Sequence, residues 1–135
     1  MKFEECTILV VDDNEAYLTL FTNYFDRFHF KTILTARDGN AAISIITAQP
    51  VDLILSDWDM PGMDGLTLLK WVRSNKDTAH LPFVMMTTRI DEVQRQEVIN
   101  AGITDFIVKP FSPKDLLDQL RSALLLEADF ESALK

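Results

Sequence analysis

Apolar residues along this chain form two alternating kinds of pattern. Short continuous runs occupy residues 8–11, 51–55, 83–86 and 106–108, with a less apolar fifth run near residues 31–35. Runs of this length are typical of strands that are covered on both faces of a parallel sheet. Between the runs, apolar residues recur every three or four positions, as on one face of a helix. The alternation predicts an α/β domain with a parallel sheet, right-handed crossovers and helices on both faces.

Capping residues and chain breakers mark the limits of five predicted helices. The helices are predicted over residues 17–28 after Asn14, over residues 40–48 after Asp38-Gly39, from Leu66 after Asp64, from Asp91 to a stop at Gly102, and after Ser112-Pro113. The helix that begins at Asp91 carries few apolar residues. We therefore expect it to be the most mobile of the five.

Composition narrows the class of protein. A chain of 135 residues fits one domain, and we expect residues 128–135 to be a C-terminal helix extension or the start of a linker. No apolar stretch is long enough to cross a bilayer and the N-terminus lacks signal-peptide features, so a cytoplasmic protein without membrane contact is expected.

The net charge of −8 opposes binding to nucleic acid or anionic lipid, which favours protein partners. Cys6 fits a small buried thiol, and His29 and His80 fit surface or loop positions.

Charged and polar residues stand at the trailing ends of four apolar runs. They are Asp12 and Asp13, Asp57, Thr87 and Lys109. Because functional sites of open parallel sheets lie beyond the carboxyl ends of the strands, we expect these side chains to meet in one pocket. Clustered carboxylates repel one another unless a cation neutralises them. Oxygen ligands without histidine or cysteine favour Mg²⁺ or Mn²⁺ over zinc.

Phosphoryl transfer is the chemistry that this set of residues suits. An aspartate can attack phosphorus and form an acyl phosphate when a metal ion and a lysine neutralise the incoming group. Asp57 is the predicted nucleophile, with Lys109 beside it and the Thr87 hydroxyl as a donor to a phosphoryl oxygen. Taken singly, each residue has a simpler interpretation: the aspartates cap helices or form turns, Lys109 is a solvated surface lysine, and Thr88 competes with Thr87.

Four segments together carry a resemblance to a known family. Val10-Val11-Asp12-Asp13-Asn14, the segment SDWDMPGMDG at residues 56–65, Thr87 and Lys109-Pro110-Phe111 resemble the receiver domain of two-component response regulators, and are most similar to the single-domain chemotaxis regulators. The resemblance covers residues 5–127. It implies a doubly wound, flavodoxin-like fold with the strand order 2-1-3-4-5. It also implies a signalling switch that catalyses its own phosphorylation and dephosphorylation, rather than a conventional enzyme.

The resemblance assigns roles to individual residues. A histidine kinase or phosphotransfer protein would phosphorylate Asp57, with Mg²⁺ held by Asp13, Asp57 and the backbone carbonyl of Asp59, and with Asp12 acting through water. Lys109 would contact the phosphoryl group, its direction fixed by a cis Lys109-Pro110 bond. The remaining implied roles are the Thr87 hydroxyl and Phe106 for switching, and Asp59 and Arg89 for tuning dephosphorylation.

Phosphorylation in this family switches a protein-binding face formed by the fourth helix, the fifth strand and the fifth helix, which a downstream output protein or domain reads. Phe106 stands where the chemotaxis protein has a tyrosine, so an inward swing can fill space beside Thr87 without a hydroxyl hydrogen bond. On sequence alone, Phe106 also fits an ordinary core position. Leu125, Leu126 and Phe130 either extend the last helix over the core or form a dimer contact, and a monomer or a phosphorylation-dependent homodimer is expected.

A different class of protein shares one of these motifs. Asp57-Trp58-Asp59 matches the Asp-x-Asp of haloacid-dehalogenase-type phosphatases, in which the first aspartate is the nucleophile and the second the general acid. That motif belongs on the first strand of its own fold, whereas here it follows the third predicted strand. A Mg²⁺-dependent phosphatase of this type is the alternative to the signalling switch.

Overall fold

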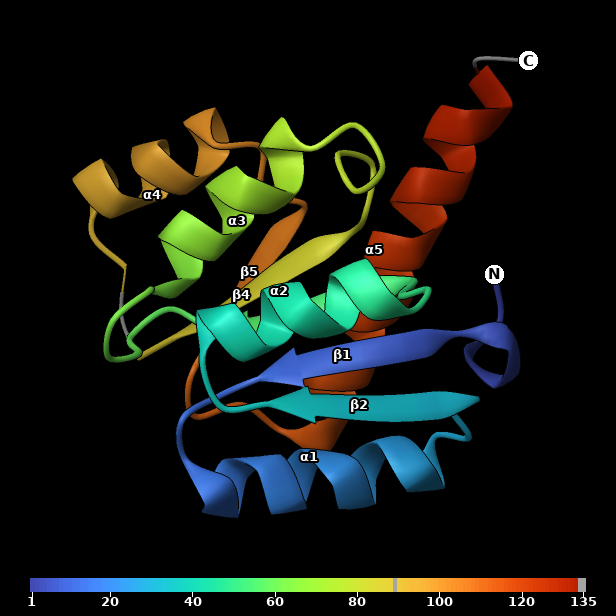
Figure 1. Cartoon of the computed structure of the whole chain (residues 1–135). Coiled ribbons are helices and arrows are strands. Elements are labelled where there is room, and N and C mark those ends of the chain that lie inside the picture. The colour runs from blue at the N-terminus through green and yellow to red at the C-terminus, as the bar shows by residue number, and fades with distance from the viewer. Residues whose placement is uncertain (89, 134–135) are drawn as a thin grey trace.

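Five parallel strands form one sheet in the order β2-β1-β3-β4-β5 in the computed structural model of this chain (Figure 1). The strands are β1 (Thr7–Val11), β2 (Thr32–Ala36), β3 (Leu53–Asp57), β4 (Phe83–Thr87) and β5 (Asp105–Val108). The structure describes the backbone of residues 1–88 and 90–133 and the side chains of residues 1–88 and 90–125. The predicted α/β fold class and strand order are confirmed.

Helices connect the successive strands. They are α1 (Glu15–Arg27), α2 (Gly39–Ala48), α3 (Gly65–Ser74), α4 (Glu92–Asn100) and α5 (Pro113–Ala133). A short 3-10 turn, η1 (Phe3–Glu5), precedes β1, although the sequence pattern did not predict it. The Phe3 ring stacks on the ring of Phe30 with 4.4 Å between centroids, and this contact folds the first residues back onto the protein.

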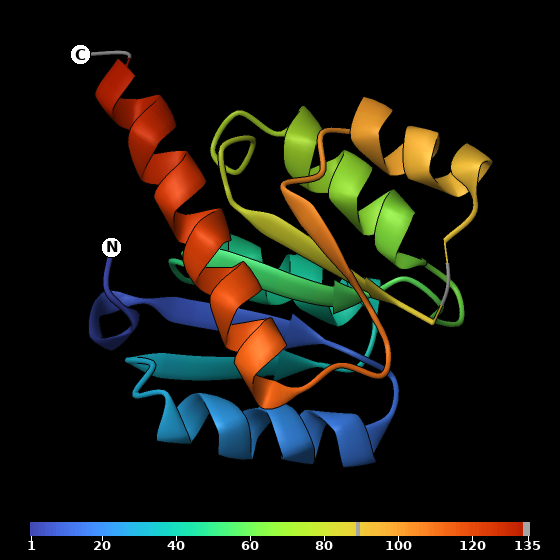
Figure 2. The same ribbon diagram turned by 180° about the vertical axis from the view of Figure 1, so that it is seen from behind.

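The helices cover both faces of the sheet. Helices α1 and α5 lie on one face, and α2, α3 and α4 lie on the other (Figures 1 and 2). Because side chains alternate along a strand, each strand contributes to two buried clusters. In β1, Ile8 and Val10 pack in the cluster with α1 and α5, and Leu9 and Val11 pack in the other. Burial on both faces explains why the strands read as continuous apolar runs.

The N-terminal caps of the helices lie at the edge of the sheet where the strands end. The predicted caps Asn14, Asp64 and Ser112 each accept a hydrogen bond from a backbone N–H of the first helical turn, at 2.9, 2.9 and 3.1 Å. Asp38 and Asp91 cap α2 and α4 in the same way, at 2.7 and 2.8 Å. These bonds satisfy donors that would otherwise lack a partner, and so define where each helix begins.

Strand β3 begins two residues later than the apolar run at residues 51–55 predicted. The Asp52 carboxylate accepts a hydrogen bond from the Thr7 N–H at 2.8 Å, so a side chain takes the place of a ladder partner there. Val51 is buried but lies outside the strand, because an apolar residue indicates burial and not backbone pairing. At its other end the strand includes Asp57, which is therefore held within the hydrogen-bonded sheet.

Helix α4 has few apolar contacts with the body. Val98 is buried, but Val93 is 70% exposed and Ile99 is 51% exposed. Of the apolar residues Val93, Val98 and Ile99, only Val98 is thus buried against the rest of the domain. The high mobility of this helix stays a prediction.

The lone cysteine and the two histidines lie where the sequence predicts them. Cys6 is buried, and His29 and His80 are exposed. His29 has a φ of 65° directly after the last turn of α1. Within the parts of the chain that the structure describes, no helix combines the length and apolarity that crossing a bilayer requires.

The C-terminal extension continues as helix. Helix α5 runs to Ala133 and projects beyond the sheet, away from the ends of the strands (Figure 1). The side chains of Leu126 and Phe130 lie outside the described residues, as does Arg89. Their predicted contacts and roles therefore stay predictions.

Candidate functional site

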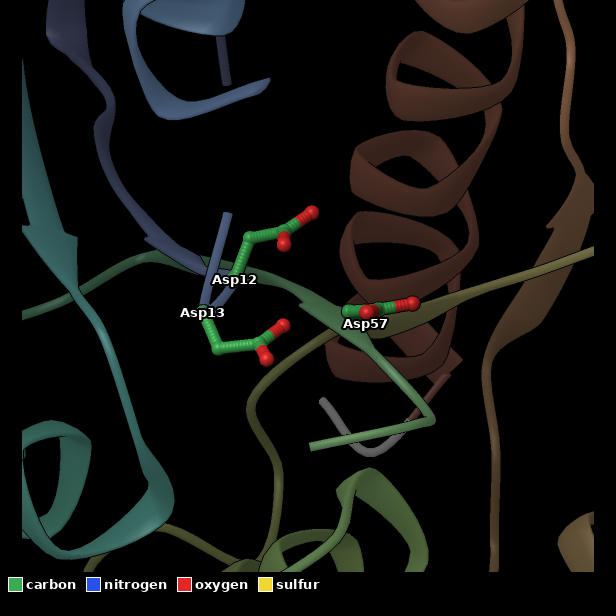
Figure 3. Close-up of side chains that lie close together, drawn as sticks. All are labelled: Asp12, Asp13 and Asp57. Atoms are coloured by element: carbon green, nitrogen blue, oxygen red, sulfur yellow. The ribbon is translucent and has the colours of Figure 1, made fainter. Parts of the chain in front are cut away.

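Three carboxylates meet at the carboxyl ends of two neighbouring strands. Asp12 and Asp13 follow β1 directly and Asp57 is the last residue of β3, which pairs with β1. Oxygen atoms of all three carboxylates lie within 4.8 Å of one another. Figure 3 shows the side chains of Asp12 and Asp13 turned toward the side on which Asp57 lies. This is an all-oxygen donor set of the kind that binds Mg²⁺ or Mn²⁺, so the residues fit a divalent cation.

Lys109 joins two of these carboxylates. Its Nζ lies 3.2 Å from Asp12 Oδ2 and 3.5 Å from Asp57 Oδ1, and the lysine side chain is only 8% exposed. The other oxygen of Asp12 accepts a hydrogen bond from the Asn14 N–H at 2.9 Å. Asp12 is therefore oriented from both sides, and the ammonium neutralises part of the acidic charge.

Thr87 lies at the end of the adjacent strand. It is 4% exposed, and its carbonyl oxygen accepts a hydrogen bond from the Lys109 N–H at 2.6 Å. The preceding residue, Met86, pairs with Asp57 across β3 and β4. Thr88 is exposed, so of the two threonines Thr87 is the one that is buried at the end of β4. The Lys109–Pro110 peptide bond is cis, as the resemblance to receiver domains implied.

Burial changes the acidity of Asp57. Removal of its carboxylate from water raises the pKa of Asp57 from 3.8 to about 6, because the charged form loses hydration. The positive charge of Lys109 opposes this change in pKa, while the negative charges of Asp12 and Asp59 add to it. Without a metal ion, the candidate nucleophile is thus partly protonated just below neutral pH.

The remaining predicted site residues lie around this centre. Asp59 is exposed, and its carboxylate is near enough to raise the pKa of Asp57. Phe106 lies on β5, with the Arg95 guanidinium 5.2 Å from its ring centroid. The structure thus gathers Asp12, Asp13, Asp57 and Lys109 directly.

Two residues of this site had no site role in the sequence analysis. Tyr17, predicted to belong to the apolar face of the first helix, has its ring 4.0 Å from Lys109 Nζ. Its position in the first turn after the Asp12-Asp13 pair was the available signal. Gly65, interpreted as a chain breaker, starts α3 directly against the end of β3.

Gly65 allows α3 to approach the backbone of Asp57. A Cβ at this position would collide with the carbonyl oxygen of Asp57 and would lie 2.6 Å from Met85 Sδ and 2.9 Å from Trp58 Cα. Two of these atoms belong to the backbone and cannot rotate away. We expect Gly65→Ala to lower the free energy of unfolding by about 1 to 3 kcal/mol, measured by urea denaturation.

Gly62 offers a control for this substitution. No atom lies within 4 Å of a Cβ built there, although its φ is +77°. Gly62→Ala should therefore cost only the strain of a left-handed backbone, about 1 kcal/mol. A Gly65→Ala protein that is as stable as the wild type would contradict the close approach described here.

Comparison with known proteins identifies the family. Residues 8–121 match the family model of the response regulator receiver domain. The chain belongs to this family. The receiver domain is 34% identical to chemotaxis protein CheY-3 of Vibrio cholerae over 113 residues, which cover 84% of this chain and 87% of that relative. These matches confirm the resemblance that the motifs indicated.

Solved structures agree with the fold of this receiver domain. The Vibrio cholerae chemotaxis protein CheY4 aligns with a TM-score of 0.85 at 31% identity, over 89% of this chain and 99% of that one. The signal receiver domain of an HD domain-containing protein from Pseudomonas fluorescens aligns with a TM-score of 0.85 at 27% identity, over 98% and 96% of the two chains. Receiver domains are signalling switches, and nothing in these matches supports the phosphatase alternative.

Proposed function

We propose that this receiver domain accepts a phosphoryl group on Asp57 from a histidine kinase or phosphotransfer protein, and that it catalyses both its own phosphorylation and its dephosphorylation. The observation that carries the proposal is the placement of a buried carboxylate between two further acids and a lysine ammonium. Such a carboxylate repels other anions unless cations neutralise the charge. The same cations neutralise an incoming phosphoryl group.

We assign the metal site to Asp12, Asp13 and Asp57, together with the backbone carbonyl of Asp59. Mg²⁺ is the proposed ion, and Mn²⁺ suits the same oxygen ligands. When bound, the ion supplies positive charge that keeps Asp57 ionised and neutralises phosphoryl oxygens. Asp12 already makes two hydrogen bonds, to the Asn14 N–H and to Lys109, so it is proposed to act on the ion through water.

In the transfer step, a carboxylate oxygen of Asp57 attacks phosphorus as the bond between phosphorus and the donor breaks. The donor leaves with the electron pair of that bond, which is a P–N bond in a phosphohistidine and a P–O bond in acetyl phosphate. Lys109 and the Thr87 hydroxyl donate hydrogen bonds to phosphoryl oxygens. In dephosphorylation, water attacks phosphorus, inorganic phosphate leaves, and the Asp57 carboxylate is restored. Asp59 and Arg89 are the residues proposed to tune the rate of this second step.

Phosphorylation is proposed to alter the face formed by α4, β5 and α5. Phe106 on β5 would move toward Thr87, and a downstream output protein or domain would read the change. Exposed apolar side chains on α4, at Val93 and Ile99, suit contact with a protein. The net charge of −8 favours protein partners over nucleic acid or membrane surfaces. We further propose a cytoplasmic location and a monomer or phosphorylation-dependent homodimer.

We treat residues 1–135 as one receiver domain, with residues 128–135 as a helical extension or the start of a linker. The helical backbone up to Ala133 supports the helical extension over the linker.

The experiment that tests the function is incubation with acetyl phosphate and Mg²⁺. We expect stoichiometric phosphorylation, detected as a single added phosphate by intact-protein mass spectrometry and mapped to Asp57 after borohydride trapping of the acyl phosphate. EDTA should prevent the labelling, since the acids then lack their neutralising ion. Trp58, which is 7% exposed and adjoins Asp57, should change its fluorescence when Mg²⁺ binds.

Two outcomes would overturn the proposal. Equal labelling in EDTA would remove the role of the metal site. Release of many equivalents of phosphate per protein, without a labelled species, would indicate a phosphatase instead of a switch.

A further inference from the structure

The ammonium of Lys109 lies between two carboxylates and an aromatic ring. On one side lie the carboxylates of Asp12 and Asp57 at 3.2 and 3.5 Å, and on the other lies the ring of Tyr17, with 4.0 Å between Nζ and the ring centroid. A cation at this distance over an aromatic face is attracted by the electron density of the ring. Because the lysine side chain is 8% exposed, little water competes with this attraction.

Tyr17 is itself held in place by a stack of rings. Its ring lies 5.8 Å from that of Phe21, and the ring of Phe21 lies 6.0 Å from that of Phe111. Phe21 is fully buried, so it gives the stack a fixed position in the core. Phe111 follows Lys109 by two residues. The segment that carries the lysine and the helix that carries Tyr17 are thus packed together through Phe21.

We propose that Tyr17 is a positioning residue for phosphoryl transfer, which directs the Lys109 ammonium toward the reacting oxygens of Asp57. The inference rests on the proposed function of Asp57 and deepens it. A lysine has a flexible four-carbon stem and a strongly hydrated head, so its direction is set by what surrounds it. The ring attracts the ammonium without neutralising it. The positive charge therefore stays available to the phosphoryl group.

The consequence for the reaction is that the lysine side chain needs less reorganisation before the phosphoryl group is transferred. With the ring present, the ammonium already lies beside Asp57 and has shed water on the side that faces α1. Without the ring, the lysine must lose that water and fix its stem during the transfer, which slows the step. Tyr17 is not one of the proposed metal ligands, so the Mg²⁺ concentration that gives half-maximal binding should stay nearly unchanged.

The experiment compares side chains of different ring character at position 17. Phosphorylation by acetyl phosphate at saturating Mg²⁺ should be about 3- to 30-fold slower for Tyr17→Leu, the range that corresponds to a partly to fully desolvated cation–π contact. Tyr17→Phe should keep a rate within about 2-fold of the wild type, because the ring remains. Tyr24→Leu is the matched control: it removes a tyrosine from the same helix that stacks on Phe28 instead, and the rate should not change.

A shape-matched pair separates electrostatics from packing. Tyr17 replaced by 3,4,5-trifluorophenylalanine keeps nearly the shape of Tyr17→Phe, but fluorine withdraws electron density from the ring face. We expect the fluorinated protein to react as slowly as Tyr17→Leu. Equal rates for the fluorinated protein and Tyr17→Phe would overturn the inference, since only packing would then matter.

A double-mutant cycle tests whether Tyr17 acts through the lysine. In a Lys109→Met background, Tyr17→Leu should cause no further loss of rate. The same fold-loss in both backgrounds would mean a purely structural role and would overturn the inference. The NMR signals of the Lys109 side-chain protons add a direct readout: the ring should shift them upfield, and Tyr17→Leu should abolish the shift.

Failure of the proposed function has a separate signature. If the wild-type protein takes up no phosphate, both proposals fall. If the wild type is labelled at the same rate as Tyr17→Leu, only the role of Tyr17 falls.

Discussion

Asp57→Asn is expected to be more stable than the wild-type protein at pH 7.5, by about 1 to 3 kcal/mol in metal-free buffer, while it accepts no phosphate. The gain in stability follows from the raised pKa of Asp57, about 6 instead of 3.8. At pH 7.5 the folded protein must hold an ionised carboxylate in a site that disfavours the charge, at about 1.4 kcal/mol for each unit of pKa. Asparagine has nearly the same shape and carries no charge.

The pH dependence has a definite direction. Between about pH 4 and pH 6 the folded protein binds a proton at Asp57 that the unfolded chain has already lost. The free energy of unfolding of the wild type should therefore fall, relative to that of Asp57→Asn, as the pH rises through this window, and the difference should be constant above it. Below about pH 4 both states are protonated at this position, and the difference should vanish.

The measurement is urea denaturation of both proteins from pH 4 to pH 8, in EDTA and in Mg²⁺. Mg²⁺ should stabilise the wild type and reduce the difference between the two proteins. Asp77→Asn, in the exposed turn after α3, is the matched control and should change stability by less than about 0.5 kcal/mol at any pH. A wild type as stable as Asp57→Asn at pH 7.5 would contradict the buried charge inferred for this site.

Lys109→Met is expected to lower the free energy of unfolding by about 2 to 4 kcal/mol at pH 7.5 without metal. Methionine keeps most of the length of the stem but removes the ammonium between Asp12 and Asp57. Deleting one member of a buried ion pair leaves uncompensated charge behind. Mg²⁺ should restore much of the lost stability. It should also bind this variant at least about 10-fold more tightly, because the lysine no longer competes for the same oxygens and no longer repels the ion.

Lys114→Met is the matched control for this prediction. The Lys114 ammonium lies 3.2 Å from Asp118, the same distance as between Lys109 and Asp12, but its side chain is 83% exposed. Its removal should cost less than about 1 kcal/mol. The checks are urea denaturation and titration of Trp58 fluorescence with Mg²⁺. Weaker Mg²⁺ binding by Lys109→Met would show that the lysine helps to build the metal site instead of competing with it.

The sequence predicted the fold well because local signals and burial agree over most of the chain. Strands buried on both faces have few polar residues, and caps such as Asn14 and Asp64 act on neighbours two or three positions away. The limits of β3 were less predictable. Val51 is apolar without pairing, and Asp57 pairs although it is charged. Apolar runs indicate what is buried, whereas strand limits depend on a backbone partner elsewhere in the chain.

The site was predictable as a set of residues but not as a set of contacts. The rule that parallel strands end at one edge brought Asp12, Asp57 and Lys109 together from positions far apart. The pairing of Lys109 with Asp12, across 97 residues, depends on where β5, which precedes the lysine, lies relative to β1, which precedes the aspartate. Helical periodicity placed Tyr17 on an apolar face, but not over a lysine. Likewise, Gly65 carries no sign in the sequence that it touches Asp57.

Every described α-helix begins at the edge of the sheet that holds the acids. This affects how charged molecules approach the protein. Aligned peptide dipoles place about half a positive charge at each helix start. This polarises the protein from end to end, although its net charge is −8. At the edge that holds Asp12, Asp13 and Asp57, these partial positive charges offset part of the acidic charge. They should therefore lower the repulsion that an anionic phosphoryl donor meets there.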